Sequence, residues 1–194
     1  MLRKMIILAV VVGISCVAWK FARSERATAE TPAPQIPGVE LIVGYQQWTR
    51  VNPEPAVVPS LIAIQCARPT LQQQEMEDNN PHRDKFVVVY VNDIGKDAMM
   101  KQRKPKFPEG TIIVKEKYPA EDHVPPELLT VMRKREAGYN PQNGDWEYMV
   151  FNGPATKVFA RGKLEPCQGC HLMHERSDYV SRNYLPNEIR NKLK

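Results

Sequence analysis

Near its C-terminus the chain reads Cys167-Gln168-Gly169-Cys170-His171. Two cysteines separated by two residues and followed directly by histidine form the attachment signature of a c-type haem. The spacing has a chemical reason, because two thiols add to the two vinyl groups of one porphyrin and the adjacent histidine is held under the iron. We therefore predict one covalent haem c bound through Cys167 and Cys170, with His171 as the iron ligand.

Two other chemistries use closely spaced cysteines. A structural zinc site needs four ligands, and the sequence has no second Cys-x-x-Cys or paired-histidine motif to complete them. A thioredoxin-like redox pair lies within a strand–helix–strand pattern, which is absent around residues 167–171. Haem attachment is favoured on both counts, and in bacteria it requires that the domain be exported.

The first 29 residues read as an export signal. Arg3 and Lys4 precede an apolar run over residues 5–19, which is shorter than the ~20 residues of a membrane-spanning helix and suits a secretory signal. Residues 27–29 offer a small-x-small cleavage site, although charged residues separate it from the apolar run. Residues 1–29 are thus a cleaved signal peptide or an uncleaved membrane anchor, and either one delivers the domain to the periplasm.

The charge of the chain gives no reason to expect a nucleic-acid partner. The formal net charge is +5, but five basic residues and a single carboxylate fall within residues 1–29. The remainder carries 22 basic and 21 acidic residues. A nearly neutral domain gives no electrostatic reason to propose nucleic-acid binding, so we predict no such partner.

The rest of the chain reads as a linker followed by one domain. Residues 30–38 are rich in proline and lack periodicity, which is typical of a tether. Residues 39–194 are long enough to form one hydrophobic core. Strands are predicted from β-branched and aromatic runs bounded by turn residues, at Leu61–Cys66, Phe86–Val91, Thr111–Tyr118, Leu128–Arg135, Trp146–Phe151 and Lys157–Ala160.

Helices are predicted between and after these strands, at Val39–Arg50, Ile94–Arg103, His171–Asn183 and from Asn187 onward. Residues 70–84 are polar and uneven, so a loop is expected there. Turn residues between 138 and 145 predict that the strands on either side pair as a hairpin. The succession predicts an α+β fold: a mostly antiparallel β-sheet with a few helices, of which a C-terminal one carries the haem motif.

The second axial position of the iron is predicted to be open. Small all-helical cytochromes c use a methionine there, but no methionine of this chain can be singled out for that role. Met99 and Met100 fall in a predicted helix, Met149 falls in a predicted strand, and Met173 lies on the helix of the motif itself. The sequence leaves the histidines outside the motif unassigned, namely His82, His123 and His174.

Four segments together resemble the cytochrome P460 family, which includes the β-type cytochromes c′. They are Tyr45–Pro53, Phe107–Glu116, Gly144–Tyr148 and the motif at 167–171. The resemblance implies a mostly antiparallel sheet, a homodimer and one five-coordinate haem c with a histidine ligand. In hydroxylamine-oxidising members, a lysine of a Gly-Thr-x-x-Val-Lys-Glu segment is bonded to the porphyrin edge, and the matching residue is Lys115.

The resemblance implies oxidation of hydroxylamine or a related small nitrogen compound, with electrons passed to a soluble acceptor. The alternative is a nitric-oxide-binding or electron-transfer cytochrome of the β-type c′ kind, without turnover. Active members use a carboxylate upstream of the motif as a base, and Glu165 is the sole carboxylate between Lys157 and Cys167. Some active relatives also carry an arginine in the strand that matches Phe86–Val91, which is wholly apolar here.

Overall fold

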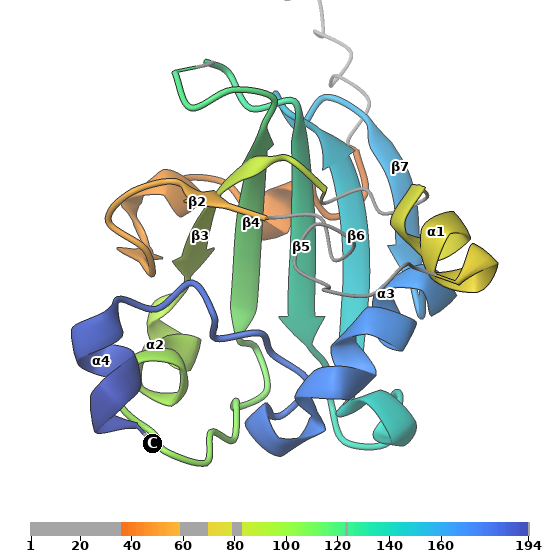
Figure 1. The fold of residues 1–194 in the computed structure, drawn as a ribbon. Coiled ribbons are helices and arrows are strands. Elements are labelled where there is room, and N and C mark those ends of the chain that lie inside the picture. The colour runs from red at the N-terminus through yellow and green to blue at the C-terminus, as the bar shows by residue number, and fades with distance from the viewer. Residues whose placement is uncertain (1–35, 59–69, 79–82, 123, 194) are drawn as a thin grey trace, which may run out of the picture. The chain divides into compact units, whose positions relative to one another are not determined.

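One antiparallel sheet dominates the fold. The computed structural model describes residues 36–58, 70–78, 83–122 and 124–193, which fall within a compact unit spanning Pro34–Lys194. Its strands are β1 (Thr49–Arg50), β2 (Ala56–Val57), β3 (Phe86–Val91), β4 (Ile112–Tyr118), β5 (Leu128–Lys134), β6 (Trp146–Asn152) and β7 (Val158–Gly162). They lie in the order β1-β3-β4-β5-β6-β7, and β2 also pairs with β3 (Figure 1).

The helices in this part of the chain are short. The α-helices are α1 (Leu71–Asp78), α2 (Asp93–Met100), α3 (Glu165–His171) and α4 (Asn187–Lys192), and the 3₁₀ helices are η1 (Val39–Leu41), η2 (Tyr45–Gln47), η3 (Pro141–Asn143) and η4 (Leu172–Ser177). Among the described residues, no helix is long and apolar enough to cross a membrane. Helices α2 and α4 lie near one edge of the sheet, and α3 lies near β6 and β7 (Figure 1).

The predicted fold class is confirmed. The strands expected from β3 to β7 all form, and β5 and β6 pair as a hairpin from Leu128 opposite Asn152 to Lys134 opposite Trp146. Helix α3 carries the Cys-x-x-Cys-His motif near the C-terminus. The strand predicted at residues 61–66, which include Cys66, lies outside the described residues, as do the predicted leader and most of the linker.

Three local predictions were wrong. Residues 39–50 do not form one helix, because Gly44 adopts a left-handed backbone conformation (φ 71°) between η1 and η2 and divides the segment. Part of the expected loop at 70–84 is helix α1, whose Leu, Gln, Glu and Met residues are good helix formers even without an apolar stripe.

The third error concerns the helix expected at residues 171–183. Helix α3 ends at His171 and continues only as the 3₁₀ helix η4, which is kinked at His174 (φ −108°). No helix extends past Ser177, because Asp178 and Tyr179 both have positive φ (54° and 63°). The chain then turns and runs back over the sheet toward α4 (Figure 1). Asp178 tolerates this conformation because its short polar side chain can bond to nearby groups.

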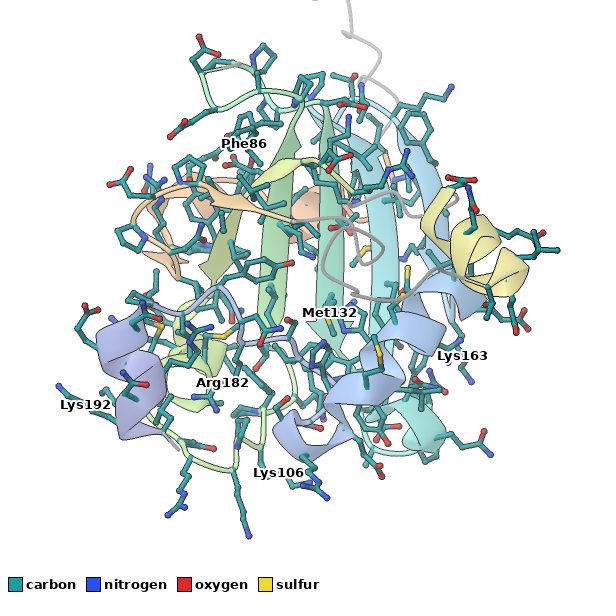
Figure 2. All side chains as sticks on the ribbon, viewed as in Figure 1. Phe86, Lys106, Met132, Lys163, Arg182 and Lys192 are labelled. Carbon is teal, nitrogen blue, oxygen red and sulfur yellow. The ribbon has the colours of Figure 1, made fainter. Side chains whose placement is uncertain are left out.

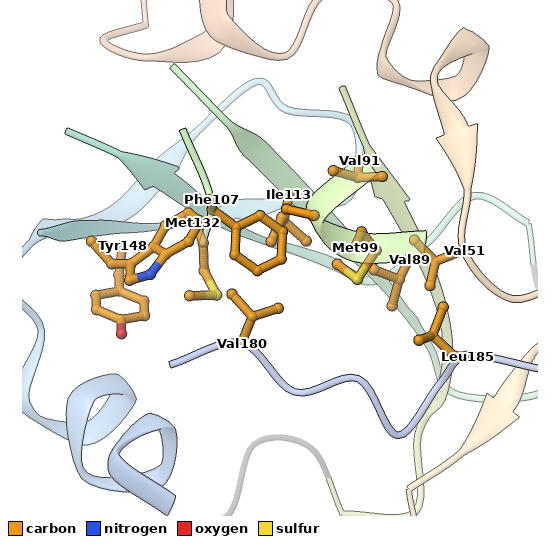
Figure 3. Close-up of a cluster of buried hydrophobic side chains, with 12 residues drawn as sticks. Val51, Val89, Val91, Met99, Phe107, Ile113, Met132, Tyr148, Val180 and Leu185 are labelled. Atoms are coloured by element: carbon orange, nitrogen blue, oxygen red, sulfur yellow. The ribbon is translucent and has the colours of Figure 1, made fainter. Parts of the chain in front are cut away.

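The two faces of the sheet bury separate apolar clusters, as the period of two along each strand requires. The inner face, defined here by Ile113, Met132 and Tyr148, packs against α2 and the C-terminal segment through Met99, Val180 and Leu185 (Figure 3). The outer face packs against the N-terminal segment, and its cluster contains Ile42, Tyr45, Ile112, Val114, Leu129, Val131, Met149 and Phe151.

Asp178 fastens the C-terminal segment to the inner face. Its carboxylate accepts hydrogen bonds from Lys134 Nζ at 2.8 and 2.9 Å and from the Phe107 amide at 2.8 Å. Its carbonyl oxygen accepts a bond from the indole N–H of Trp146 at 2.8 Å. Because Asp178 follows the haem motif by only seven residues, these contacts also set the position of the motif.

Candidate functional site

A pocket lies between the inner face of the sheet and helix α3. The residues lining it from the sheet include Ile113, Lys115, Thr130, Met132 and Tyr148, and those from α3 are Pro166, Cys167, Cys170 and His171. Met132 projects from β5 into the space between α3 and the pair α2 and α4 (Figure 2). The pocket thus joins the two features that the sequence singled out, the Cys-x-x-Cys-His motif and Lys115.

Helix α3 places both cysteines of the motif on the pocket. They are three positions apart in the sequence, so they lie about one turn apart on the same side of the helix. Cys167 is half-buried, Cys170 is exposed, and both are free thiols. Burial raises the pKa of the Cys167 thiol, while the nearby Lys117 ammonium opposes this shift.

The imidazole of His171 is held by the backbone that follows the helix. Nδ1–H donates a hydrogen bond to the carbonyl oxygen of Tyr179 at 2.6 Å, since a carbonyl can only accept. Burial lowers the pKa of His171 to about 4, outweighing this bond, and the charge of Lys115 adds to the lowering. The ring is therefore neutral near pH 7, with Nε2 carrying the lone pair that a metal ion needs.

Lys115 reaches the pocket from β4, as the resemblance led us to expect. Its side chain is half-buried, and Nζ donates a hydrogen bond to the hydroxyl of Tyr184 at 3.1 Å. The ammonium also lies 5.0 Å from the centre of the Tyr184 ring. Burial is the largest cause of the lowered pKa values of His171 and His174, and the charge of Lys115 adds to both.

A second lysine lies on the inner face of the same strand. Lys117 is two residues beyond Lys115, so both side chains project from the same side of β4. Only 1% of Lys117 is exposed, and burial lowers its pKa to about 7, with repulsion from Lys115 adding to the shift. Near neutral pH, Lys117 is therefore present in part as the neutral amine.

Tyr148 contributes a hydroxyl that has no hydrogen-bond partner among the described residues. The residue is 3% exposed and lines the pocket from β6, and its ring centre lies 5.4 Å from that of His171. Burial is the largest cause of its raised pKa, so the phenol stays protonated and can donate. A buried donor without an acceptor is costly, which suggests that a molecule with polar atoms fills this pocket.

The carboxylate suggested by the sequence, Glu165, does not line the pocket. Glu165 is exposed at the first turn of α3. Glu116 follows Lys115 directly but faces the outer side of the sheet, where it accepts hydrogen bonds from Tyr45 and Tyr118 at 2.6 and 2.7 Å. The described lining residues include no aspartate or glutamate.

The methionines considered as axial ligands and the histidines outside the motif lie in different parts of the fold. Met99 is buried in the inner-face cluster, and Met173 is 74% exposed. Met149 belongs to the outer-face cluster, although it also borders the pocket. His174 is half-buried with its ring centre 6.3 Å from that of His171. His82 and His123 lie outside the described residues.

Sequence reasoning missed four residues of the site: Lys117, Met132, Tyr148 and Tyr184. Alternation along β4 was sufficient to place Lys117 beside Lys115. The register of the β5–β6 hairpin, in which Met132 is opposite Tyr148, was not predicted, although the hairpin was. No local pattern marks Tyr184, because it meets Lys115 only through the path of the C-terminal segment.

These residues fit the haem that the motif predicts. Two free thiols lie on one side of α3, and a neutral imidazole presents Nε2. Apolar side chains from the sheet form the floor, and the unpartnered Tyr148 hydroxyl offers a donor. Among the described residues, no group of three or more histidine, cysteine, aspartate or glutamate side chains is arranged to hold a metal ion without a porphyrin.

Comparison with known proteins agrees with the sequence resemblance. A family model described as Cytochrome P460 matches residues 67–182, which cover β3 to β7, the pocket and the haem motif. A search of curated proteins finds no match to this chain. Because the matched segment spans more than half of the 194 residues, the chain belongs to the cytochrome P460 family, whose members bind haem.

Proposed function

We propose that this protein is an exported mono-haem c-type cytochrome that oxidises hydroxylamine or a related small nitrogen compound. One observation carries the proposal: Lys115 and the Cys-x-x-Cys-His motif line the same pocket. A haem in this pocket supplies an iron that exchanges electrons and has an open position for a small ligand. The substrate class follows from the resemblance to the hydroxylamine-oxidising members of the family.

The residues of α3 hold the cofactor in this proposal. Cys167 and Cys170 form thioether bonds, which require two thiols on one side of the helix. His171 binds the iron through Nε2, and the Tyr179 carbonyl keeps the proton on Nδ1 and limits rotation of the ring. Asp178 anchors the segment that carries Tyr179, and this anchoring limits movement of the His171 side chain.

Lys115 distinguishes a catalyst from a carrier. We propose that its Nζ replaces one hydrogen at the edge of the porphyrin, forming a carbon–nitrogen bond. Starting from the neutral amine, one N–H and one C–H bond would break, and two protons and two electrons would leave. An oxidant of the peroxide class would accept the two protons and the two electrons and be reduced to water. An amine substituent changes the shape and electron density of the ring, which are recognised determinants of haem reactivity.

The proposed function includes export of the domain, a soluble electron acceptor and a homodimer. The basic residues and apolar run of the first 29 residues support delivery to the periplasm, with the leader either cleaved or kept as a membrane tether. Electrons from the substrate then pass to a soluble acceptor. On the basis of the family resemblance, the protein is proposed to form a homodimer.

A second candidate is a nitric-oxide-binding or electron-transfer cytochrome of the β-type c′ kind, without turnover. It is favoured by the absence of a carboxylate among the described residues that line the pocket. Oxidation of hydroxylamine releases protons, and a carboxylate is the base that active relatives use. Both candidates share the haem and the His171 ligand, so they differ at Lys115 and in turnover.

Tryptic digestion of the purified protein tests the proposal. We expect one haem peptide that contains Lys115 together with Cys167 and Cys170, and a reduced optical spectrum displaced from that of ordinary haem c. The variant Lys115→Met should restore the ordinary spectrum and abolish hydroxylamine oxidation with an artificial acceptor. Lys101→Met, at an exposed lysine of α2's C-terminal end, is the matched control. An unmodified Lys115 in the wild type would instead support the binding cytochrome.

A further inference from the structure

Tyr184 makes the closest described contact with the Lys115 amine. Its hydroxyl accepts the 3.1 Å hydrogen bond from Nζ, and its ring face lies under the same ammonium at 5.0 Å. The two residues are 69 positions apart in the chain. Tyr184 also lies beyond residue 182, where the family match ends.

The backbone around Tyr184 is fixed from both sides. Leu185 is 4% exposed and packs in the inner-face cluster (Figure 3), and the Tyr184 ring packs against the same cluster. Arg182 donates hydrogen bonds to the carbonyl oxygens of Met99 and Gln102 at 3.1 and 2.7 Å, which ties the segment to α2. The Tyr184 hydroxyl is therefore a fixed point against which a mobile side chain can be held.

Lysine has a flexible four-carbon stem, so its amine samples many positions unless a partner selects one. We propose that Tyr184 is a positioning residue that holds the Lys115 amine at the edge of the haem, so that formation of the Lys115–haem bond depends on the Tyr184 hydroxyl. This inference rests on the cross-link in the proposed function. The bond-forming step is the one balanced above, with peroxide as the oxidant and water as its product.

The neighbours of the amine explain why a positioning group is needed. Lys117 lies on the same face of β4 and repels the Lys115 ammonium, and the ring of His171 lies in the same pocket. Repulsion between two cations on one strand favours positions that separate the amines. The Tyr184 oxygen and ring both attract the ammonium, so they select one of these positions.

The test compares Tyr184→Phe with the wild type and with Tyr139→Phe. Phenylalanine keeps the packing of the ring and removes only the oxygen. Tyr139 is a matched control, because its ring contacts Arg135 and Lys163 away from the pocket. Each protein, loaded with haem through Cys167 and Cys170, is treated with hydrogen peroxide, and the fraction of haem peptide containing Lys115 is followed by mass spectrometry and by the reduced spectrum.

We expect the cross-link to form about five- to ten-fold more slowly in Tyr184→Phe, as for loss of one hydrogen bond that orients a reacting group, and at the wild-type rate in Tyr139→Phe. Thermal unfolding should be unchanged in both, which separates positioning from a structural role. Equal rates in Tyr184→Phe and the wild type would overturn the inference and leave the proposed cross-link intact. A wild type without any cross-link would overturn both.

Discussion

Nδ1 of His171 and the carbonyl oxygen of Tyr179 lie 2.6 Å apart, so a backbone group outside helix α3 orients the predicted iron ligand. The carbonyl can only accept, and the proton therefore resides on Nδ1. A hydrogen bond from the ring nitrogen that does not bind the metal commonly fixes the orientation and raises the basicity of a metal-bound histidine. His171 and the carbonyl group that orients it both belong to one short segment, residues 167–179.

The first prediction concerns His171 itself. His171→Ala should abolish the spectrum of ferrous haem with one histidine ligand while leaving the thioether bonds, because Cys167 and Cys170 attach the porphyrin independently. Optical and resonance Raman spectra of the reduced protein measure the ligation. His174→Ala, one turn further on, should keep the wild-type spectrum. Unchanged spectra in His171→Ala would refute the assigned ligand.

The second prediction concerns Asp178, which supports Tyr179. Asp178→Ala breaks an ion pair in which the side chains are only 6% and 13% exposed and leaves Lys134 charged and buried. The free energy of unfolding should fall by about 3–5 kcal/mol, as measured by urea denaturation. Adding Lys134→Met should recover part of this loss, because the stranded charge is removed. Glu175→Ala, at an exposed carboxylate nearby, should cost less than about 0.5 kcal/mol.

The third prediction concerns the pH dependence of stability. The folded pKa of Lys117, about 7, is below its ordinary value of 10.5. Between these values the unfolded chain binds more protons at this residue, so its contribution to the free energy of unfolding rises with pH and is least favourable below pH 7. Lys117→Met should therefore be more stable than the wild type at pH 6, by a few kcal/mol at about 1.4 kcal/mol per pKa unit.

Urea denaturation at several pH values between 6 and 9 measures this effect. The stability difference between Lys117→Met and the wild type should shrink steadily as the pH rises through this window. Lys101→Met removes an exposed lysine and should show a constant difference. A difference for Lys117→Met that does not vary with pH would show that Lys117 keeps its charge in the folded protein.

The fourth prediction concerns the unpartnered hydroxyl of Tyr148. In haem-free protein, Tyr148→Phe should leave the free energy of unfolding unchanged or slightly higher, because a buried hydroxyl without an acceptor contributes no net stability. In haem-loaded protein the same change should cost about 1 kcal/mol, the usual value of one hydrogen bond. Equal effects in both forms would show that the haem offers this hydroxyl no acceptor.

Much of the fold followed from local patterns. β3 was predicted residue by residue, because Phe86–Val91 is a continuous β-branched and aromatic run bounded by turn residues. The helix expected at 39–50 failed because apolar spacing does not reveal that Gly44 takes a left-handed conformation. Helix α1 was missed for the opposite reason, since its helix-forming residues carry no apolar stripe.

By itself, the sequence determined the haem motif and the mostly antiparallel sheet. Each depends on residues close together in the chain, where spacing and alternation are informative. Lys115 was singled out by the resemblance to the cytochrome P460 family. Only the tertiary structure decided that Lys115 meets Tyr184, that Lys117 is buried and that Tyr179 holds His171. These relationships join segments whose distance in space is set by packing of the C-terminal segment on the sheet, which no local pattern encodes.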